Sequence, residues 1–362
     1  MNALAAFLLL AGSALAAETT VTVGGRPLSG LQGAKGDPSA YELAPVSDWI
    51  DEPFDTVLLQ GVLRDYRIII EAARAQTRGT PEPERLDWVR AETAVFPGGR
   101  FWAKARLPNA ARGRVLMRTL ASGHGQAPGA EVFEVEAFTA AEDRESEQSA
   151  AASPAPVPVR REAPKPAVVP REDWGAKPPK EPYSPMTPVK ITQHHTAGKR
   201  PTAPEEALAE MRFIQDFHQN GRGWIDIGYH FVIDGAGRIY QGRPETVLGT
   251  HVADHNGGNV GISLMGTYHP PNNDEFSAPQ REALIGLLLW LRDACGISPD
   301  TYIGHRDYNP KTSCPGDLVE AELPALRDSM RAARAPFASA AGRLELERLP
   351  RLIERARADG GF

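Results

Sequence analysis

Histidine and cysteine side chains gather in the second half of this chain. Eight of the nine histidines follow residue 190, and both cysteines, Cys295 and Cys314, lie there as well. His194, His305 and Cys314 offer two imidazoles and one thiolate, a three-ligand set for zinc that leaves one coordination position for water. The spacing alone permits such a site without requiring it, because two unrelated histidines and a buried cysteine would leave the same pattern.

The local geometry of a strand narrows the choice of ligand. Successive side chains on a strand point to opposite faces, so His194 and His195 cannot both reach one metal from an extended segment. A metal-binding Cys314 cannot pair with Cys295. We therefore expect Cys295, at the predicted end of a helix, to be a small buried hydrophobe.

Length and composition limit the class of protein. The 362 residues allow about two domains with connectors. The hydrophobic share of 41% and the charged share of 24% are typical of globular proteins. A net charge of −6 gives no general basic excess, so nucleic acid is not expected as a partner. Two cysteines exclude a disulfide-dense scaffold.

The first residues have the pattern of an export signal. Residues 3–16 are apolar and end in Ala14, Leu15 and Ala16, a small-x-small arrangement typical of a cleavage site. The run is too short to cross a bilayer as a helix, which needs about 20 residues. We expect residues 1–17 to be a signal peptide cleaved near Ala16 and Ala17. The product would be periplasmic or secreted, without a transmembrane segment.

Residues 18–140 predict an all-β, sandwich-like domain whose role the sequence does not indicate. Residues 101–107 and 133–137 alternate in the period of two that is typical of half-buried strands. Further strands are expected at 56–59, 66–70 and 114–117, with a turn at 97–99. Residues 141–170 are rich in proline and alanine, a composition that favours an extended linker between two domains.

Residues 171–330 predict an α/β domain with a central mixed sheet flanked by helices. Strands are expected at 191–196, 229–233 and 260–265. Two capping boxes, 202–205 and 277–280, are expected to open helices, the second of which would end near Gly296. Residues 331–362 predict a charged, partly helical tail.

The second domain resembles the peptidoglycan recognition protein and type-2 N-acetylmuramoyl-L-alanine amidase family, which includes the phage T7 lysozyme type. The resemblance covers roughly residues 170–330 and implies nothing about residues 18–140. The matching motifs stand in the family's order, at residues 171–176, 191–197, 223–231, 234–243, 249–251, 259–262, 304–307 and 313–316.

The resemblance implies roles for several of these residues. It implies His194, His305 and Cys314 as zinc ligands and places Tyr229 near the zinc-bound water. Family members that have lost hydrolysis commonly lack the cysteine, so Cys314 favours an active enzyme.

The resemblance also implies a substrate groove. His251 resembles a histidine that lines it, and Asn259 is assigned to the same groove. Arg243 is a candidate partner for a carboxylate of the stem peptide. Trp224, after Gly223, resembles members that prefer diaminopimelate-type stem peptides.

One spacing departs from the family pattern. Cys314 lies nine positions after His305, where the family's cysteine usually lies eight positions after the histidine. The position two before the cysteine, which carries a catalytic residue in the family, is Thr312 here, with Lys311 as the alternative. Tyr229 or Thr312 is expected to stabilise the oxyanion. No acid that could protonate the leaving amine is evident in the sequence.

These features together predict a secreted zinc amidase that cleaves the bond between N-acetylmuramic acid and L-alanine in peptidoglycan. One alternative is a module that binds peptidoglycan or muropeptides without hydrolysing them. Another is a zinc hydrolase for a different amide, such as one in a soluble muropeptide.

Overall fold

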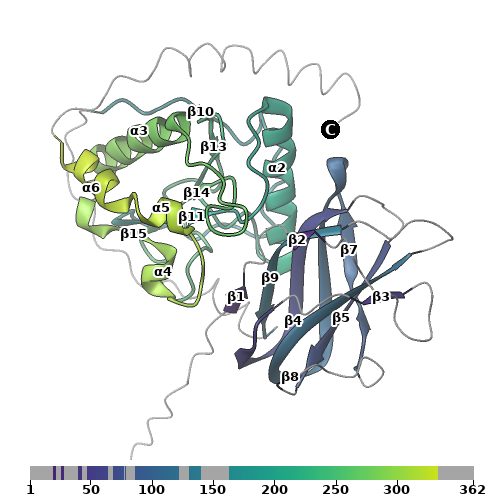
Figure 1. Cartoon of the computed structure of the whole chain (residues 1–362). Helices are drawn as coiled ribbons and strands as arrows, with labels where there is room; N and C mark the ends of the chain where they lie inside the picture. Colours follow the sequence, from purple (N-terminus) through teal and green to yellow (C-terminus); the bar gives the residue numbers. More distant parts are fainter. Residues whose placement is uncertain are drawn as a thin grey trace, which may run out of the picture.

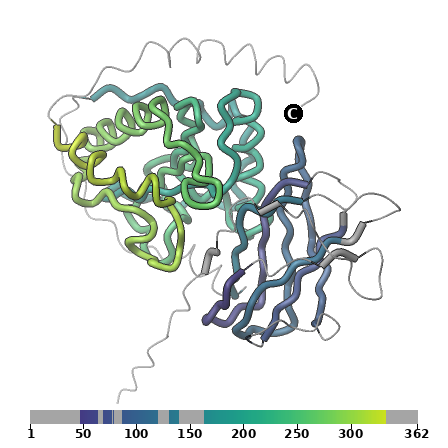
Figure 2. The backbone as a smooth tube through the Cα atoms, viewed as in Figure 1, coloured from purple at the N-terminus to yellow at the C-terminus, as the bar shows by residue number. Residues whose placement is uncertain are grey.

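The computed structural model describes residues 19–21, 26–27, 40–42, 47–63, 68–76, 78, 86–121, 130–139 and 163–332. They form an all-β N-terminal domain and an α/β C-terminal domain that lie against each other (Figures 1 and 2). The expected signal peptide, most of the expected linker and the tail beyond residue 332 lie outside the described residues. Within the described part, no helix is long and apolar enough to cross a membrane.

The N-terminal domain is a single nine-stranded sheet with the main order β1-β9-β4-β8-β5-β6. Its strands are β1 (Thr19–Val21), β2 (Arg26–Pro27), β3 (Ala40–Glu42), β4 (Ile50–Leu63), β5 (Ile68–Ala75), β6 (Val89–Arg90), β7 (Glu92–Val95), β8 (Arg100–Ala121) and β9 (Ala130–Phe138). The predicted turn at 97–99 is a short 3₁₀ turn between β7 and β8.

The two strands expected at 101–107 and 114–117 are one long strand, β8, which corrects the sequence-based prediction. Its first half pairs with β4 and its second half with β5. The sheet therefore curls around one core that contains side chains of β4, β5, β8 and β9. The Pro108–Asn109 segment, which suggests a break, is held at an irregularity of the β4–β8 pairing, where the Arg74 guanidinium donates to the carbonyl and side-chain oxygens of Asn109.

The C-terminal domain has a six-stranded mixed sheet with the order β10-β13-β12-β14-β11-β15. The strands are β10 (Val168–Val169), β11 (Lys190–His195), β12 (Phe231–Ile233), β13 (Ile239–Gln241), β14 (Asn259–Leu264) and β15 (Tyr302–Gly304). All neighbouring pairs are parallel except β12 with β13. Because β10 belongs to this sheet, the last residues of the expected linker are part of the domain.

The helices of the C-terminal domain agree in part with those predicted from the sequence. They are α2 (Pro204–Asp216), the π-helix η3 (Phe217–Arg222), α3 (Ala278–Cys295), the 3₁₀ turn η4 (Pro299–Thr301), α4 (His305–Tyr308), α5 (Asp317–Glu320) and α6 (Leu323–Arg331). The capping box at Ser277 and Gln280 and the left-handed Gly296 are confirmed for α3. The other capping box is wrong, because α2 starts after Ala203 without a side-chain cap. Pro204 fits that first position, since its missing N–H has no partner there in any helix.

The central sheet is covered on both faces. One face packs against α3 and α6 in a core that includes Ile191, Leu287 and Leu326. The other face packs against α2, and this second core continues into the N-terminal domain through Leu58, Trp102 and Phe138. Figure 1 shows α2 between the two domains. We refer to this second, shared set of apolar residues as the interdomain core.

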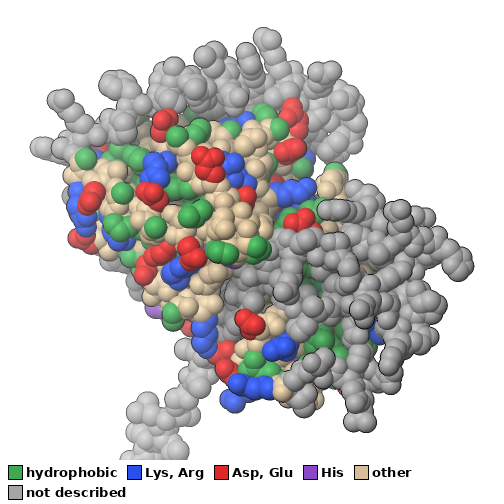
Figure 3. All heavy atoms as spheres, viewed as in Figure 1, with side chains coloured by type: hydrophobic (Ala, Val, Ile, Leu, Met, Phe, Trp, Pro, Cys, Tyr) green, Lys and Arg blue, Asp and Glu red, His purple; other side chains and the backbone are tan. Residues whose placement is uncertain are grey.

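Polar contacts also join the two domains. The Arg100 guanidinium of β8 forms a bidentate ion pair with Glu210 of α2, at 2.7 and 3.0 Å, and both side chains are buried. Trp102 donates its indole N–H to Asp216 at 3.0 Å. Lys104 donates to the carbonyl oxygen of Gly221 at 2.6 Å. On the outer surface in Figure 3, by contrast, acidic and basic side chains are intermixed over the C-terminal domain.

Candidate metal centre

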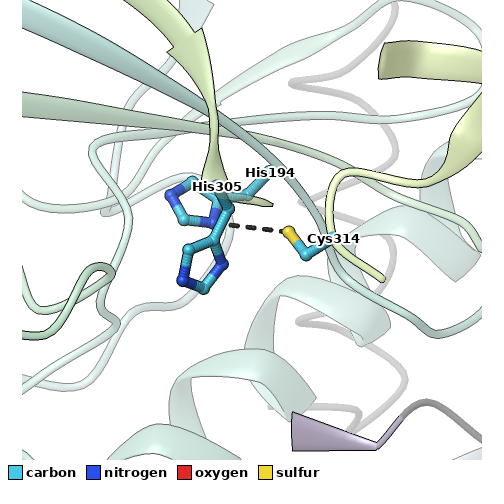
Figure 4. Close-up of side chains that lie close together, drawn as sticks. All are labelled: His194, His305 and Cys314. Atoms are coloured by element: carbon cyan, nitrogen blue, oxygen red, sulfur yellow. Dashed lines mark hydrogen bonds between the residues drawn. The ribbon is translucent and has the colours of Figure 1, made fainter. Parts of the chain in front are cut away.

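Three elements of the C-terminal domain bring His194, His305 and Cys314 together (Figure 4). Strands β11 and β15 are parallel neighbours, with Gln193 opposite Gly304. The next residues along both strands, His194 and His305, therefore emerge at the same edge. Cys314 comes from the loop between α4 and α5. The ligand atoms of the three side chains all lie within 4.8 Å of one another.

The donor atoms of this cluster fit a zinc ion. The Nδ1 atom of His194 lies 3.5 Å from the Sγ atom of Cys314. Tetrahedral zinc with ordinary Zn–N and Zn–S bonds places such a nitrogen and sulfur about 3.5 Å apart. The rings of His194 and His305 have their centroids 4.6 Å apart. Two imidazoles and one thiolate would leave the fourth zinc position open toward the pocket.

The tautomer of His194 follows from a chain of hydrogen bonds. Nε2 of His251 lies 3.0 Å from the carbonyl oxygen of Asn259, which can only accept, so Nε2 carries the proton. Burial lowers the pKa of His251 well below its usual value, so the ring is neutral and its Nδ1 accepts. Nδ1 lies 3.0 Å from Nε2 of His194, which must then donate. This leaves a lone pair on Nδ1 of His194, the atom that faces Cys314.

Burial also sets the protonation of the other ligands. It lowers the pKa of His305 to about 4, which keeps this imidazole neutral and able to bind a metal. Burial also raises the pKa of the Cys314 thiol. The backbone N–H of His195 donates to Sγ at 3.4 Å and partly opposes this rise. A metal ion would have to displace the thiol proton on binding, as thiolate ligation requires.

The His251→Leu variant should weaken zinc binding about 10- to 100-fold, the usual cost of losing a residue that orients a metal-binding histidine. The leucine retains most of the buried volume but accepts no hydrogen bond from His194. Competition with a chromophoric chelator would measure the affinity. The matched control is His255→Leu, which changes an exposed histidine in the following loop. Equal affinities of the two variants would contradict the tautomer argument.

A pocket that is partly open to solvent surrounds the cluster. Of the residues that the sequence assigned to catalysis or substrate binding, Tyr229, Thr312, His251 and Trp224 line it. The ring of Tyr229 lies 5.3 Å from that of His194. The hydroxyl oxygen of Thr312 accepts from the N–H of Cys314 at 3.2 Å, so its own O–H is available as a donor. Lys311 lies outside the pocket and forms an ion pair with Glu52 of the N-terminal domain.

Two residues expected in the substrate groove lie elsewhere. Arg243 is buried, and its guanidinium donates to the carbonyl oxygens of Ile227, Leu248 and Asp226. It therefore braces the loops around the site instead of presenting a charge to a ligand. Asn259 is buried as well and contributes its backbone carbonyl to His251.

The pocket includes side chains that the sequence analysis did not select. His218 and Arg222 come from η3, and the ring of His218 stacks on Trp224 with centroids 4.8 Å apart. Glu134 and Glu136 come from β9 of the N-terminal domain. The alternation of residues 133–137 predicts the strand, but it does not indicate that the polar side of this strand faces another domain.

The C-terminal domain is similar to known proteins of one family. Residues 184–317 match the family model described as N-acetylmuramoyl-L-alanine amidase. The chain is 35% identical over 134 residues to peptidoglycan-recognition protein SC2 of Drosophila melanogaster, a match that covers 36% of this chain and 69% of that protein. The chain belongs to the peptidoglycan recognition protein and N-acetylmuramoyl-L-alanine amidase family.

Other relatives are matched over very different shares of their own length. An N-acetylmuramoyl-L-alanine amidase of Sus scrofa is 37% identical over 161 residues, which are 42% of this chain and 26% of that protein. The solved structure of peptidoglycan recognition protein-LE in complex with tracheal cytotoxin is 30% identical, with a TM-score of 0.41, and the match covers 44% of this chain and 93% of that one. The family thus contains proteins named for hydrolysis and proteins named for recognition.

Proposed function

We propose that this protein is a zinc-dependent amidase that hydrolyses the bond between N-acetylmuramic acid and L-alanine in peptidoglycan. The observation that carries the proposal is the His194, His305 and Cys314 cluster, whose free side faces a pocket. Residues 1–17 are proposed to export the enzyme to the compartment that holds its substrate. The names of the family's amidases support this reaction.

The residues around the cluster have distinct tasks in this reaction. Bound zinc would act as a Lewis acid on the amide carbonyl and lower the pKa of a water toward about 7. Burial raises the pKa of Tyr229 well above its usual value, so its phenol stays protonated and can donate to the developing oxyanion. The Thr312 hydroxyl is a second donor for the same charge. Trp224 and His218 form an aromatic wall against which the substrate can pack.

The proposal is tested by removing and restoring the metal in the full chain. We expect one zinc per chain and the release of free L-alanine amino termini from purified peptidoglycan. Chelation should abolish the release, and added zinc should restore it. A zinc-free chain that binds sacculi without releasing peptides would overturn the amidase and favour a recognition module. Release from soluble muropeptides alone would favour a hydrolase for that substrate.

A further inference from the structure

The N-terminal domain contributes two carboxylates to the pocket around the cluster. Glu134 and Glu136 lie on β9, and both line the pocket together with the three ligands. Glu134 lines the same pocket as Cys314 and Tyr229. The site is therefore built from two domains, and the family resemblance covers only one of them.

An irregularity in the sheet directs Glu134 toward the pocket. Opposite β4, Gly61 pairs with Val132 while Gln60 pairs with Glu134, so Phe133 is an extra residue on β9. Val132 and Val135 both point into the core of the β domain, which leaves Phe133 and Glu134 together on the side of the C-terminal domain. A side chain at position 61 would collide with the carbonyl of Glu131, so this bulge requires glycine. Bulges of this kind commonly reorient side chains at functional sites.

A network across the interface holds Glu134 in place. The amide nitrogen of Gln60 donates to the Glu134 carboxylate. The amide oxygen of Gln60 accepts from Arg100 at 2.8 Å, and Arg100 is itself paired with Glu210 of α2. The charge of Arg100 is therefore largely balanced by Glu210, and the direct partner of Glu134 is a neutral amide.

The two carboxylates differ in their surroundings. Glu136 lies 3.1 Å from Nε of the buried Arg222, so it has a cationic partner across the domain interface. Glu134 is 9% exposed, and its burial raises its pKa to about 7, against the lowering effects of the Gln60 hydrogen bond and the Arg100 charge. With this pKa, Glu134 can exchange a proton near neutral pH.

We propose that Glu134 is the proton carrier of the amidase site, supplied by the N-terminal domain. As the carboxylate, it takes a proton from the water that attacks the lactyl carbonyl carbon, and the new C–O bond forms. As the carboxylic acid, it returns this proton to the nitrogen of L-alanine when the C–N bond breaks. One water is consumed, and an acid and an amine are released. This assignment rests on the proposed amidase function.

The test compares Glu134→Gln with the unaltered full chain. We expect kcat for L-alanine release to fall about 10²- to 10⁴-fold, the usual contribution of a general acid–base group, with little change in KM. Zinc content should stay at one per chain. The loss should be at least about tenfold smaller for a muramoyl p-nitroanilide, because its weakly basic amine leaves with less need for a proton. The matched control is Glu131→Gln, which changes a half-exposed residue of β9 outside the pocket and should leave kcat unchanged.

The outcomes separate this inference from the proposed function. If the unaltered chain releases no L-alanine, the amidase itself fails. If the unaltered chain is active and Glu134→Gln is equally active, Glu134 is not the proton carrier. Equal loss of activity on both substrates overturns its role as the acid that protonates the leaving amine. If Glu134→Gln does not fold, the activity of Glu134→Asp tests the assignment instead. This variant keeps a carboxylate with a shorter reach, so partial activity with the same leaving-group dependence as the unaltered chain supports the assignment, and full activity overturns it.

Discussion

Replacing Cys314 by serine in the full chain is expected to abolish zinc binding and amide hydrolysis together. A serine hydroxyl does not ionise at neutral pH and is a poor zinc ligand, so the site would keep only two imidazoles. Losing a Lewis acid that supplies several kcal/mol of transition-state stabilisation should lower L-alanine release at least about 10³-fold. Elemental analysis of the metal and quantification of new amino termini measure the two losses.

The other cysteine provides the control for this variant. Cys295 is the last residue of α3, half-buried and outside the pocket, so Cys295→Ser should retain zinc and activity. A Cys314→Ser protein that still binds sacculi would separate recognition from hydrolysis. Full zinc occupancy and normal release in Cys314→Ser would show that the thiolate is not a ligand.

The Glu210→Ala variant is expected to lower the free energy of unfolding by about 3–5 kcal/mol. The substitution leaves the Arg100 guanidinium buried at the domain interface without its carboxylate, and breaking a buried pair in this way carries that cost. Urea denaturation of the full chain, followed by tryptophan fluorescence, gives the free energy. The control on the same helix is Glu206→Ala, an exposed position that should change it by less than about 0.5 kcal/mol. Equal stability of the two variants would contradict a stabilising role for the pair.

The sequence predicted best where the determining interactions are local. The N-terminus of α3 is set by Ser277 and Gln280, three residues apart, and its end by Gly296. The three candidate ligands were selected from their residue types and from the family motifs that contain them, and the structure brings them together although Cys314 lies 120 positions after His194. Strand β11 was likewise predicted to within one residue.

The features that the sequence did not predict depend on distant partners. Asn109 stays within β8 because Arg74 of a neighbouring strand holds it. Arg243 looks like a ligand for a carboxylate until the fold surrounds its guanidinium with carbonyl oxygens. The local alternation predicts only that Glu134 lies on the polar side of a strand, because the domain that covers it is remote in the sequence. Such contacts arise only when the tertiary structure forms, so no local pattern records them.

The interdomain core has a consequence for how the molecule loses its structure. Leu58, Trp102 and Phe138 of the β domain pack in the same apolar cluster as Met211 and Phe213 of α2. Separating the domains would expose this surface to water, at a cost of roughly 25 cal/mol for each Å². Neither domain can therefore detach cheaply while the other stays intact. The proline-rich boundary that divides the chain in sequence does not divide it thermodynamically, and the two domains should melt as one cooperative unit.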